Sequence, residues 1–269
     1  MIREVGRILS EKLIRANMTM DCPRLEYFET IDSTNTYLKR SAVDGAPDRA
    51  VAVANAQSAG RGRMGRTFQS PSGKGLYLSI LLRPAVSAQT LMCATGMAAV
   101  AAARAVEKAC GARPAIKWTN DLVLAGRKLC GILAETVMLG SETALIIGVG
   151  VNVHHGREDF DGEVAEIATS LAAEGFDADR SALAAALIEE LYRLGDALGG
   201  DISACVDEYR KRCVTIGQEV RLMWTEGQER ALALDIDERF GLVVRHENGE
   251  VSTIRTGEVS VRGLYGYAE

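Results

Sequence analysis

The stretch AIKWTNDLVLAGRKLCGILAE, residues 115–135, says most about the fold. It begins with a β-prone run, Ala115–Trp118, which breaks at the turn pair Asn120-Asp121. Alternation beyond this turn predicts a further strand with Lys128 at its start. The alternating residues are Leu129, Gly131, Leu133 and Glu135. Two lysines and an aspartate would therefore converge at one edge of a sheet.

The converging residues Lys117, Asp121 and Lys128 are candidates for catalysis. Acyl-adenylate chemistry needs cations that neutralise an α-phosphate and an attacking carboxylate, and a carboxylate near Mg²⁺ or an incoming amine. The residues alone leave a second interpretation open. Asn120-Asp121 would then be an ordinary hairpin turn, with both lysines facing solvent.

Strands and helices are also predicted on both sides of this stretch. Expected strands are Leu25–Ile31, Ala50–Ala54, Leu76–Leu82, Lys128–Met138 and Thr143–Val153. Expected helices are one capped by Asp32-Ser33-Thr34-Asn35, one over 88–110 that ends at Gly111, Ser181–Leu198, and Ile202–Arg212. Strands gathered with interspersed helices, without strict βαβ alternation, favour an α+β fold with a mixed sheet.

The pattern changes after Gly217, where short alternating runs are separated by Gly and Asn. Such runs predict a small all-β barrel. We expect a leader over residues 1–22, a main domain over 23–214 and the barrel over 215–269. The leader is too short for a winged helix-turn-helix, which needs three helices and a hairpin.

Composition narrows the class of protein. The 269 residues carry a net charge of −5, whereas a nucleic-acid binder needs a basic face. The six cysteines are scattered without a C-x-x-C pair, which indicates reduced thiols. The N-terminus has no secretory signal, and no apolar run reaches the ~20 residues of a membrane span. We expect a cytoplasmic protein with neither a nucleic-acid nor a membrane partner.

A loop rich in glycine and arginine, QSAGRGRMGR at residues 57–66, is the second candidate site. It matches G-x-G-x-x-G, but the segment after it contains a proline and further glycines where a dinucleotide site requires a helix. A P-loop is excluded because Phe68 stands where its first glycine is needed. The loop arginines suit an anion, which would order a loop that is disordered before binding. A solvated basic loop remains the alternative.

The run Gly148–Val153 is an apolar strand whose glycines allow a ligand to come close. Asn152 is its one polar side chain and is able to bond a base or a ribose. The adjacent His154-His155 does not indicate a metal site, because neighbours on a strand point to opposite faces and no third ligand is nearby. The ligands of any metal stay unassigned.

Taken together, these blocks resemble motifs of the bacterial biotin protein ligase family. The matching blocks are Ser33-Thr34-Asn35 (STN), Gln57 with Gly60–Gly65 (Q-x-x-GRGR-x-G), Lys117–Asp121 (KWPND), Arg127–Leu133 (RKLxGIL), Gly148–Asn152 (GxGxN) and Gly257–Arg262 (GEISLR). One such motif would be weak, but the whole set in family order and spacing is specific. This chain departs from the family at Thr119, where proline is usual, and at Phe68, where tryptophan is frequent.

The resemblance implies a class II synthetase-like catalytic domain, an SH3-like C-terminal barrel and a form without the DNA-binding domain of repressor members. It implies a ligase that makes biotinyl-AMP from biotin and MgATP, then biotinylates a lysine of a biotin carboxyl carrier protein. Family members often pair through sheet edges, so a homodimer is allowed. A lipoate-type ligase and a non-catalytic biotin sensor remain as alternatives.

The resemblance also implies roles for individual residues. The catalytic set is Arg63, Lys117, Asp121 and Lys128. The biotin-binding set is Ser33, Thr34, Gln57, Gly60, Arg61, Arg63, Lys128 and Gly131. The nucleotide-binding set is Arg61, Arg63, Phe68, Lys117, Asn120, Lys128 and Asn152.

Overall fold

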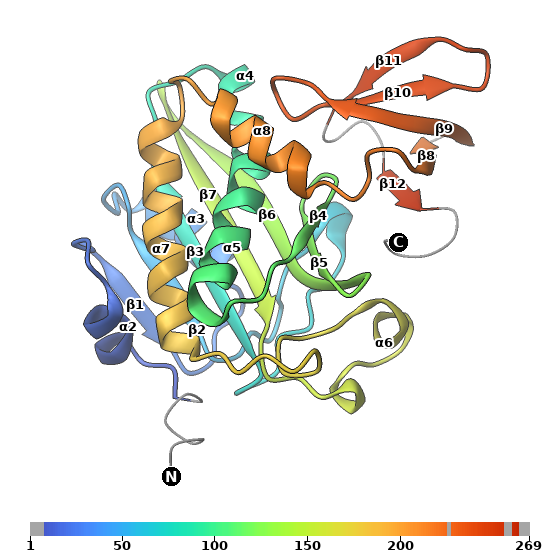
Figure 1. Ribbon diagram of the computed structural model, residues 1–269. Coiled ribbons are helices and arrows are strands. Elements are labelled where there is room, and N and C mark those ends of the chain that lie inside the picture. Colours follow the sequence, from blue (N-terminus) through green and yellow to red (C-terminus); the bar gives the residue numbers. More distant parts are fainter. Residues whose placement is uncertain (1–7, 225–226, 256–259, 264–269) are drawn as a thin grey trace.

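The computed structural model describes residues 8–224, 227–255 and 260–263, and its centre is a seven-stranded mixed sheet (Figure 1). The strand order is β1-β2-β3-β7-β6-β5-β4, with β1 and β2 parallel and every other pair antiparallel. The strands are β1 (Leu25–Phe28), β2 (Val51–Ala54), β3 (Gly75–Leu82), β4 (Ala115–Lys117), β5 (Asp121–Leu124), β6 (Arg127–Leu139) and β7 (Glu142–Asn152). The predicted α+β class and mixed sheet are confirmed.

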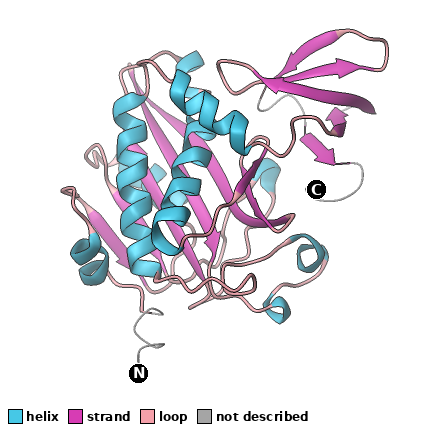
Figure 2. Ribbon diagram, viewed as in Figure 1, coloured by secondary structure: helices cyan, strands magenta, loops and turns pink. Residues whose placement is uncertain are grey.

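Helices cover both faces of this sheet, but unequally, and Figure 2 shows the more heavily covered face toward the viewer. Two long helices, α5 (Ala94–Cys110) and α7 (Arg180–Ala197), contact each other and lie across one face. Beside them lie α8 (Ser203–Arg212), which contacts α5, and α2 (Glu11–Asn17), which contacts α7. The opposite face carries α3 (Thr34–Val43), and the short helices α4 (Ala88–Leu91) and α6 (Glu163–Ile167) lie in connections.

The hydrophobic core follows the alternation of the strands. One set of β3 side chains joins the large core cluster on the face where β3 contacts α7: Leu76, Leu78, Ile80 and Leu82. Its neighbour Leu81 points the other way and joins Leu38 of α3 and Ile146 of β7 in a smaller cluster. The strand is therefore buried along its whole length, which explains its apolar composition.

Most predicted elements are confirmed, with ends that differ by a few residues. Ser33 caps α3 as expected by accepting a hydrogen bond from Thr36 N at 3.4 Å. Gly111 ends α5 in the left-handed conformation, with φ of 76°. The helix expected over 88–110 is divided into α4 and α5, and the strand expected to reach Ile31 ends at Phe28.

A second, antiparallel sheet follows α8 in the chain and lies beyond it in Figure 1. Its order is β11-β10-β9-β8-β12, from β8 (Glu219–Trp224), β9 (Gly227–Ile236), β10 (Leu242–His246), β11 (Val251–Ile254) and β12 (Ser260–Gly263). The predicted C-terminal β region is thus confirmed. The Gly257–Val259 part of the last motif lies outside the described residues.

Within the described part of the chain, no helix combines the length and the apolar composition that crossing a membrane requires.

Candidate functional site

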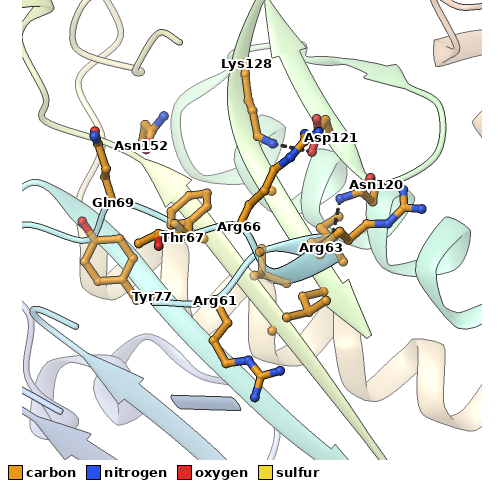
Figure 3. A pocket seen from close by; sticks show the side chains of 18 of the residues that line it. Arg61, Arg63, Arg66, Thr67, Gln69, Tyr77, Asn120, Asp121, Lys128 and Asn152 are labelled. Atoms are coloured by element: carbon orange, nitrogen blue, oxygen red, sulfur yellow. Dashed lines mark hydrogen bonds and ion pairs between the residues drawn. The ribbon is translucent and has the colours of Figure 1, made fainter. Parts of the chain in front are cut away.

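A cavity of about 810 Å³ opens where the start of α3 meets the central sheet. Its walls come from four regions: the α3 N-terminus, the Gly-Arg loop, the β4–β5 hairpin and a segment after β7. Strands β3, β6 and β7 supply the floor. Regions far apart in sequence thus meet at one site, as Figure 3 shows for its labelled side chains.

Glycines on neighbouring strands make the floor. Gly131 of β6 pairs with Gly150 of β7, and Gly148 pairs with Leu133. The ring of Phe68 lies on this floor: a Cβ atom on Gly150 would overlap it, and one on Gly131 would come within 3.1 Å of Phe68 Cε2. Both positions therefore need the close approach that glycine allows. The predicted stacking residue Phe68 thus lies inside the cavity.

The α3 end of the cavity is a buried hydrogen-bonded cluster. Thr34 donates to Gln57 Oε1 from both its backbone nitrogen, at 2.9 Å, and its hydroxyl, at 3.2 Å. Gln57 Nε2 donates to Ser70 Oγ at 3.0 Å. Ser33 precedes Thr34 and is buried with it. The structure brings together Ser33, Thr34 and Gln57, which were predicted to bind biotin.

The Gly-Arg loop runs along the cavity, and its arginines face different partners (Figure 3). Arg63 Nη1 donates to Asn120 Oδ1 at 2.9 Å, and burial lowers the pKa of Arg63 below its usual value. Arg61 turns the other way, with Nη2 3.2 Å from Glu135 Oε1. The loop contains a short 3₁₀ turn, Arg63–Gly65. Its predicted disorder before ligand binding stays a prediction.

The predicted convergence of two lysines and an aspartate is confirmed. Lys117 and Asp121 pair across β4 and β5, and Lys128 Nζ lies 2.8 Å from Asp121 Oδ1. All three residues line the cavity, near the end of the sheet formed by β4. Asn120 lies in the hairpin turn and donates to Ile132 O at 3.0 Å. The alternative interpretation is right that the segment makes a hairpin turn, but Lys117 and Lys128 are only partly exposed and line the cavity.

The hairpin is held from behind by the C-terminal part of the chain. Trp118 Nε1 donates to Phe240 O at 2.8 Å, and Trp118 N donates to Thr215 Oγ1 at 3.0 Å. The hydroxyl of Tyr209 donates to Thr119 O at 3.2 Å. A cis peptide bond joins Trp118 to Thr119. The second sheet and α8 therefore help to fix the position of the hairpin.

Asn152, predicted to contact a nucleotide, lines the cavity but is mostly buried. Its Nδ2 donates to Thr169 O at 3.0 Å, and Thr169 N donates to Lys128 O at 2.8 Å. These bonds attach the segment after β7 to the floor strands. The segment adds cavity residues that sequence reasoning missed: Phe160, Val164, Glu166, Ile167 and Ala168. No motif marks them, and Tyr77 of β3 was also missed.

Charge in the cavity favours an anionic ligand. Its lining includes five cationic side chains: Arg61, Arg63, Arg66, Lys117 and Lys128. The carboxylates among the lining residues are those of Asp121 and Glu166. This excess of positive charge, together with the polar α3 end of the cavity, suits a ligand that carries both phosphate and carboxylate groups.

Comparison with known proteins agrees with this site. Residues 27–152 match the model of the biotin/lipoate A/B protein ligase family. The chain is 33% identical to the bifunctional ligase/repressor BirA of Bacillus spizizenii over 258 residues, covering 93% of this chain and 78% of that protein. It is 32% identical to the biotin–[acetyl-CoA-carboxylase] ligase of Mycobacterium tuberculosis over 244 residues, 88% of each chain.

A solved structure extends the agreement to the fold. The biotin protein ligase of Aquifex aeolicus, in complex with biotin and ATP, superimposes with a TM-score of 0.75 at 26% identity. The match covers 90% of this chain and 99% of that one. On its sequence, its fold and the motifs gathered at its cavity, this chain belongs to the biotin protein ligase family.

Proposed function

We propose that the protein is an ATP-dependent biotin protein ligase. It joins biotin and ATP into biotinyl-5′-AMP with release of pyrophosphate, then transfers biotin to a lysine of a carrier protein. One observation carries this proposal: a single cavity joins the polar Ser33–Thr34–Gln57 end to the Lys117–Asp121–Lys128 end. The first end suits the ureido ring of biotin, and the second suits its carboxylate and the α-phosphate.

In the first step, a biotin carboxylate oxygen attacks the α-phosphorus, and the bond to the pyrophosphate oxygen breaks. Lys117 and Lys128 neutralise the two anions that must approach each other. Holding both substrates in one cavity converts a rare encounter between two dissolved molecules into a reaction of positioned groups. At best, such positioning lowers the activation free energy by about 7 kcal/mol or more. Arg61 and Arg63 lie along the same cavity, where they neutralise phosphate charge and exclude water from the mixed anhydride.

In the second step, the carrier amine attacks the biotinyl carbonyl carbon, and the bond to the AMP oxygen breaks. The amine must lose a proton as the amide forms. Asp121 is our candidate to orient this amine and accept the proton, because its carboxylate lines the cavity beside Lys128.

The nucleotide would occupy the region around Phe68, Asn120 and Asn152. An adenine ring can stack on Phe68, and the two amides lie at the cavity wall. Asp121 and Glu166 would supply oxygen ligands of the kind Mg²⁺ uses, usually one or two carboxylates together with substrate phosphates. Bound there, Mg²⁺ would neutralise phosphate charge.

The acceptor that we propose is a biotin carboxyl carrier protein or carrier domain, in line with the name of the Mycobacterium tuberculosis relative. We also propose domain boundaries at 23–214 and 215–269, with the C-terminal sheet closing as an SH3-like barrel. The separate five-stranded sheet that begins at β8 supports this division. A homodimer through a sheet edge remains a prediction.

The deciding experiment is ATP–pyrophosphate exchange by the purified protein with Mg²⁺, comparing biotin, lipoate and no acid. Exchange with biotin alone supports the proposal. Exchange with lipoate would instead show that the protein is a lipoate-type ligase. Tight biotin binding in calorimetry without exchange would overturn the enzyme and leave a biotin sensor.

A further inference from the structure

Glu135 of β6 is a meeting point for side chains from three parts of the chain. Its Oε1 lies 2.8 Å from Lys39 Nζ and 3.2 Å from Arg61 Nη2. Its Oε2 accepts a hydrogen bond from Asn35 Nδ2 at 3.0 Å. Lys39 and Asn35 belong to α3, whereas Arg61 belongs to the Gly-Arg loop. One carboxylate therefore ties the loop to the helix that starts the polar end of the cavity.

The tie continues to the polar end through hydrogen bonds. Asn35 Oδ1 lies 2.6 Å from Ser79 Oγ, which is 2.7 Å from Thr34 Oγ1. Thr34 in turn donates to Gln57. The path depends on Gly148, because a Cβ atom there would overlap the Asn35 amide. An unbroken chain of contacts thus runs from Arg61 to the pocket proposed for the ureido ring.

Glu135 is suited to hold cations. Its side chain is 15% exposed, so its ion pairs are less screened by solvent than those at the surface. Burial by itself raises the pKa of Glu135, but hydrogen bonds from Lys39 and Asn35 and the charges of Lys39 and Arg61 outweigh it, so the pKa falls below its usual value. Arg61, in contrast, is 47% exposed and lies on a glycine-rich segment. The carboxylate is the more fixed partner, and the loop arginine is held by it.

We propose that Glu135 is a positioning residue that holds Arg61 against α3 before substrate binds. The Gly-Arg loop then starts close to the conformation that receives an anionic acid. When only a fraction of the protein is in the binding-competent state, the apparent Kd for the ligand rises in inverse proportion to that fraction. Glu135 would therefore act on substrate binding rather than on the chemical step. The choice of biotin as the acid rests on the proposed function.

The test variant is Glu135→Gln, which keeps an oxygen for Asn35 and removes the charge that holds Lys39 and Arg61. We expect KM for biotin in pyrophosphate exchange to rise about tenfold, with kcat within about twofold of the native value. Glu135→Asp, which keeps the charge, should recover part of the loss. The matched control is Glu142→Gln on β7, whose exposed carboxylate pairs with Arg83 outside the cavity. A fall in kcat with unchanged KM would overturn the proposal.

A double-mutant cycle separates positioning from a general structural role. If Glu135 acts through Arg61, adding Glu135→Gln to Arg61→Ala should raise KM no further. Independent effects would multiply, and that result would also overturn the proposal. Lys39→Met serves as a comparison, because it removes the other cation and leaves the Arg61–Glu135 pair in place.

Limited trypsin digestion of the unliganded protein gives a readout that needs no activity. We expect faster cleavage at the loop arginines in Glu135→Gln than in the native protein, at equal thermal stability. Equal cleavage rates would contradict the proposal. If Glu135→Gln does not fold, Arg61→Ala removes the same ion pair from the loop side, and cleavage after Arg63 and Arg66 answers the same question. A native protein without biotin-dependent exchange would overturn the proposed function, while this digestion would still test the role of Glu135.

Discussion

Lys128 Nζ lies 2.8 Å from Asp121 Oδ1 at the cavity wall, so the two opposite charges neutralise each other. We assign Lys128 to the adenylation step and Asp121 to the transfer step. An anionic substrate must compete with Asp121 for this lysine. We expect Lys128→Ala to lower kcat for biotin-dependent pyrophosphate exchange by about 10²–10³-fold, the cost typical of losing one group that stabilises developing charge. Lys211→Ala on the exposed part of α8 is the matched control. Near-native exchange by Lys128→Ala would refute its assigned role.

Asp121→Asn should separate the two half-reactions. The amide keeps the shape of the side chain but cannot accept the amine proton. We expect transfer from preformed biotinyl-AMP to the carrier to slow by about 10²-fold, within the usual range for general base catalysis, and by more than pyrophosphate exchange slows. Single-turnover transfer followed by mass spectrometry of the carrier measures this. Equal slowing of both half-reactions would show that Asp121 acts mainly through Lys128.

Gly150→Ala tests the glycine floor. The added methyl group would overlap the Phe68 ring, whereas at Gly131 it would be 3.1 Å away and smaller shifts would suffice. We expect Gly150→Ala to weaken biotin binding in calorimetry by about tenfold or more and Gly131→Ala to weaken it less, with unfolding free energies lowered by about 1–3 kcal/mol. Gly227→Ala, with open space around the position, is the control. The reverse order of effects would contradict the packing described.

Trp118→Phe tests the support of the hairpin by the C-terminal sheet. The substitution removes the donor to Phe240 O and leaves that buried carbonyl without this bond. We expect a loss of about 1–3 kcal/mol in the free energy of urea unfolding. Because Lys117 and Asp121 flank the turn, kcat for exchange should fall as well. Unchanged stability would mean that the contact contributes little.

Glu189 predicts a pH effect on stability. This buried carboxylate of α7 accepts hydrogen bonds from Thr19 and Lys108, and despite an opposing effect of burial its pKa falls to about 2. A folded-state pKa below the unfolded value gives stability that is present at neutral pH and is lost as the pH falls from about 4.5 toward 2. We expect Glu189→Gln to lower unfolding free energy at pH 7 by about 3 kcal/mol, and this difference should shrink over that window.

Denaturant unfolding at a series of pH values measures the effect, with Glu11→Gln at an exposed ion pair as the control. A difference between native protein and Glu189→Gln that stays constant from pH 7 to pH 3 would contradict the assigned pKa.

Short-range sequence patterns were sufficient to predict the helices and strands whose alternation or capping residues lie within the element or directly at its ends. The alternation from Leu76 to Leu82 predicted β3, and the Ser33 cap and the Gly111 stop predicted the ends of two helices. Two strands were missed, Asp121–Leu124 and Val251–Ile254. Each has four residues and little alternation of its own, so its conformation depends on the strands with which it pairs.

The same distinction holds for the site. The turn after Trp118 and the alternation beyond it predicted that Lys117, Asp121 and Lys128 would converge, because they lie within one short stretch of chain. The contact between Arg61 and Glu135, and the contributions of Tyr77 and Phe160, arise only when distant segments pack together. No short-range spacing encodes these contacts, so sequence reasoning did not find them.

The floor of paired glycines also limits how this site can change in evolution or by engineering. Gly131 and Gly150 already have the smallest side chains available, so every substitution there adds atoms and shrinks the space. A variant that accepts a bulkier acid must therefore arise elsewhere in the lining, as in the Gly-Arg loop. The loop arginines also exclude water from the reactive anhydride in our mechanism. A variant that accepts a wider range of acids would then also lose more of its acyl-adenylate to hydrolysis.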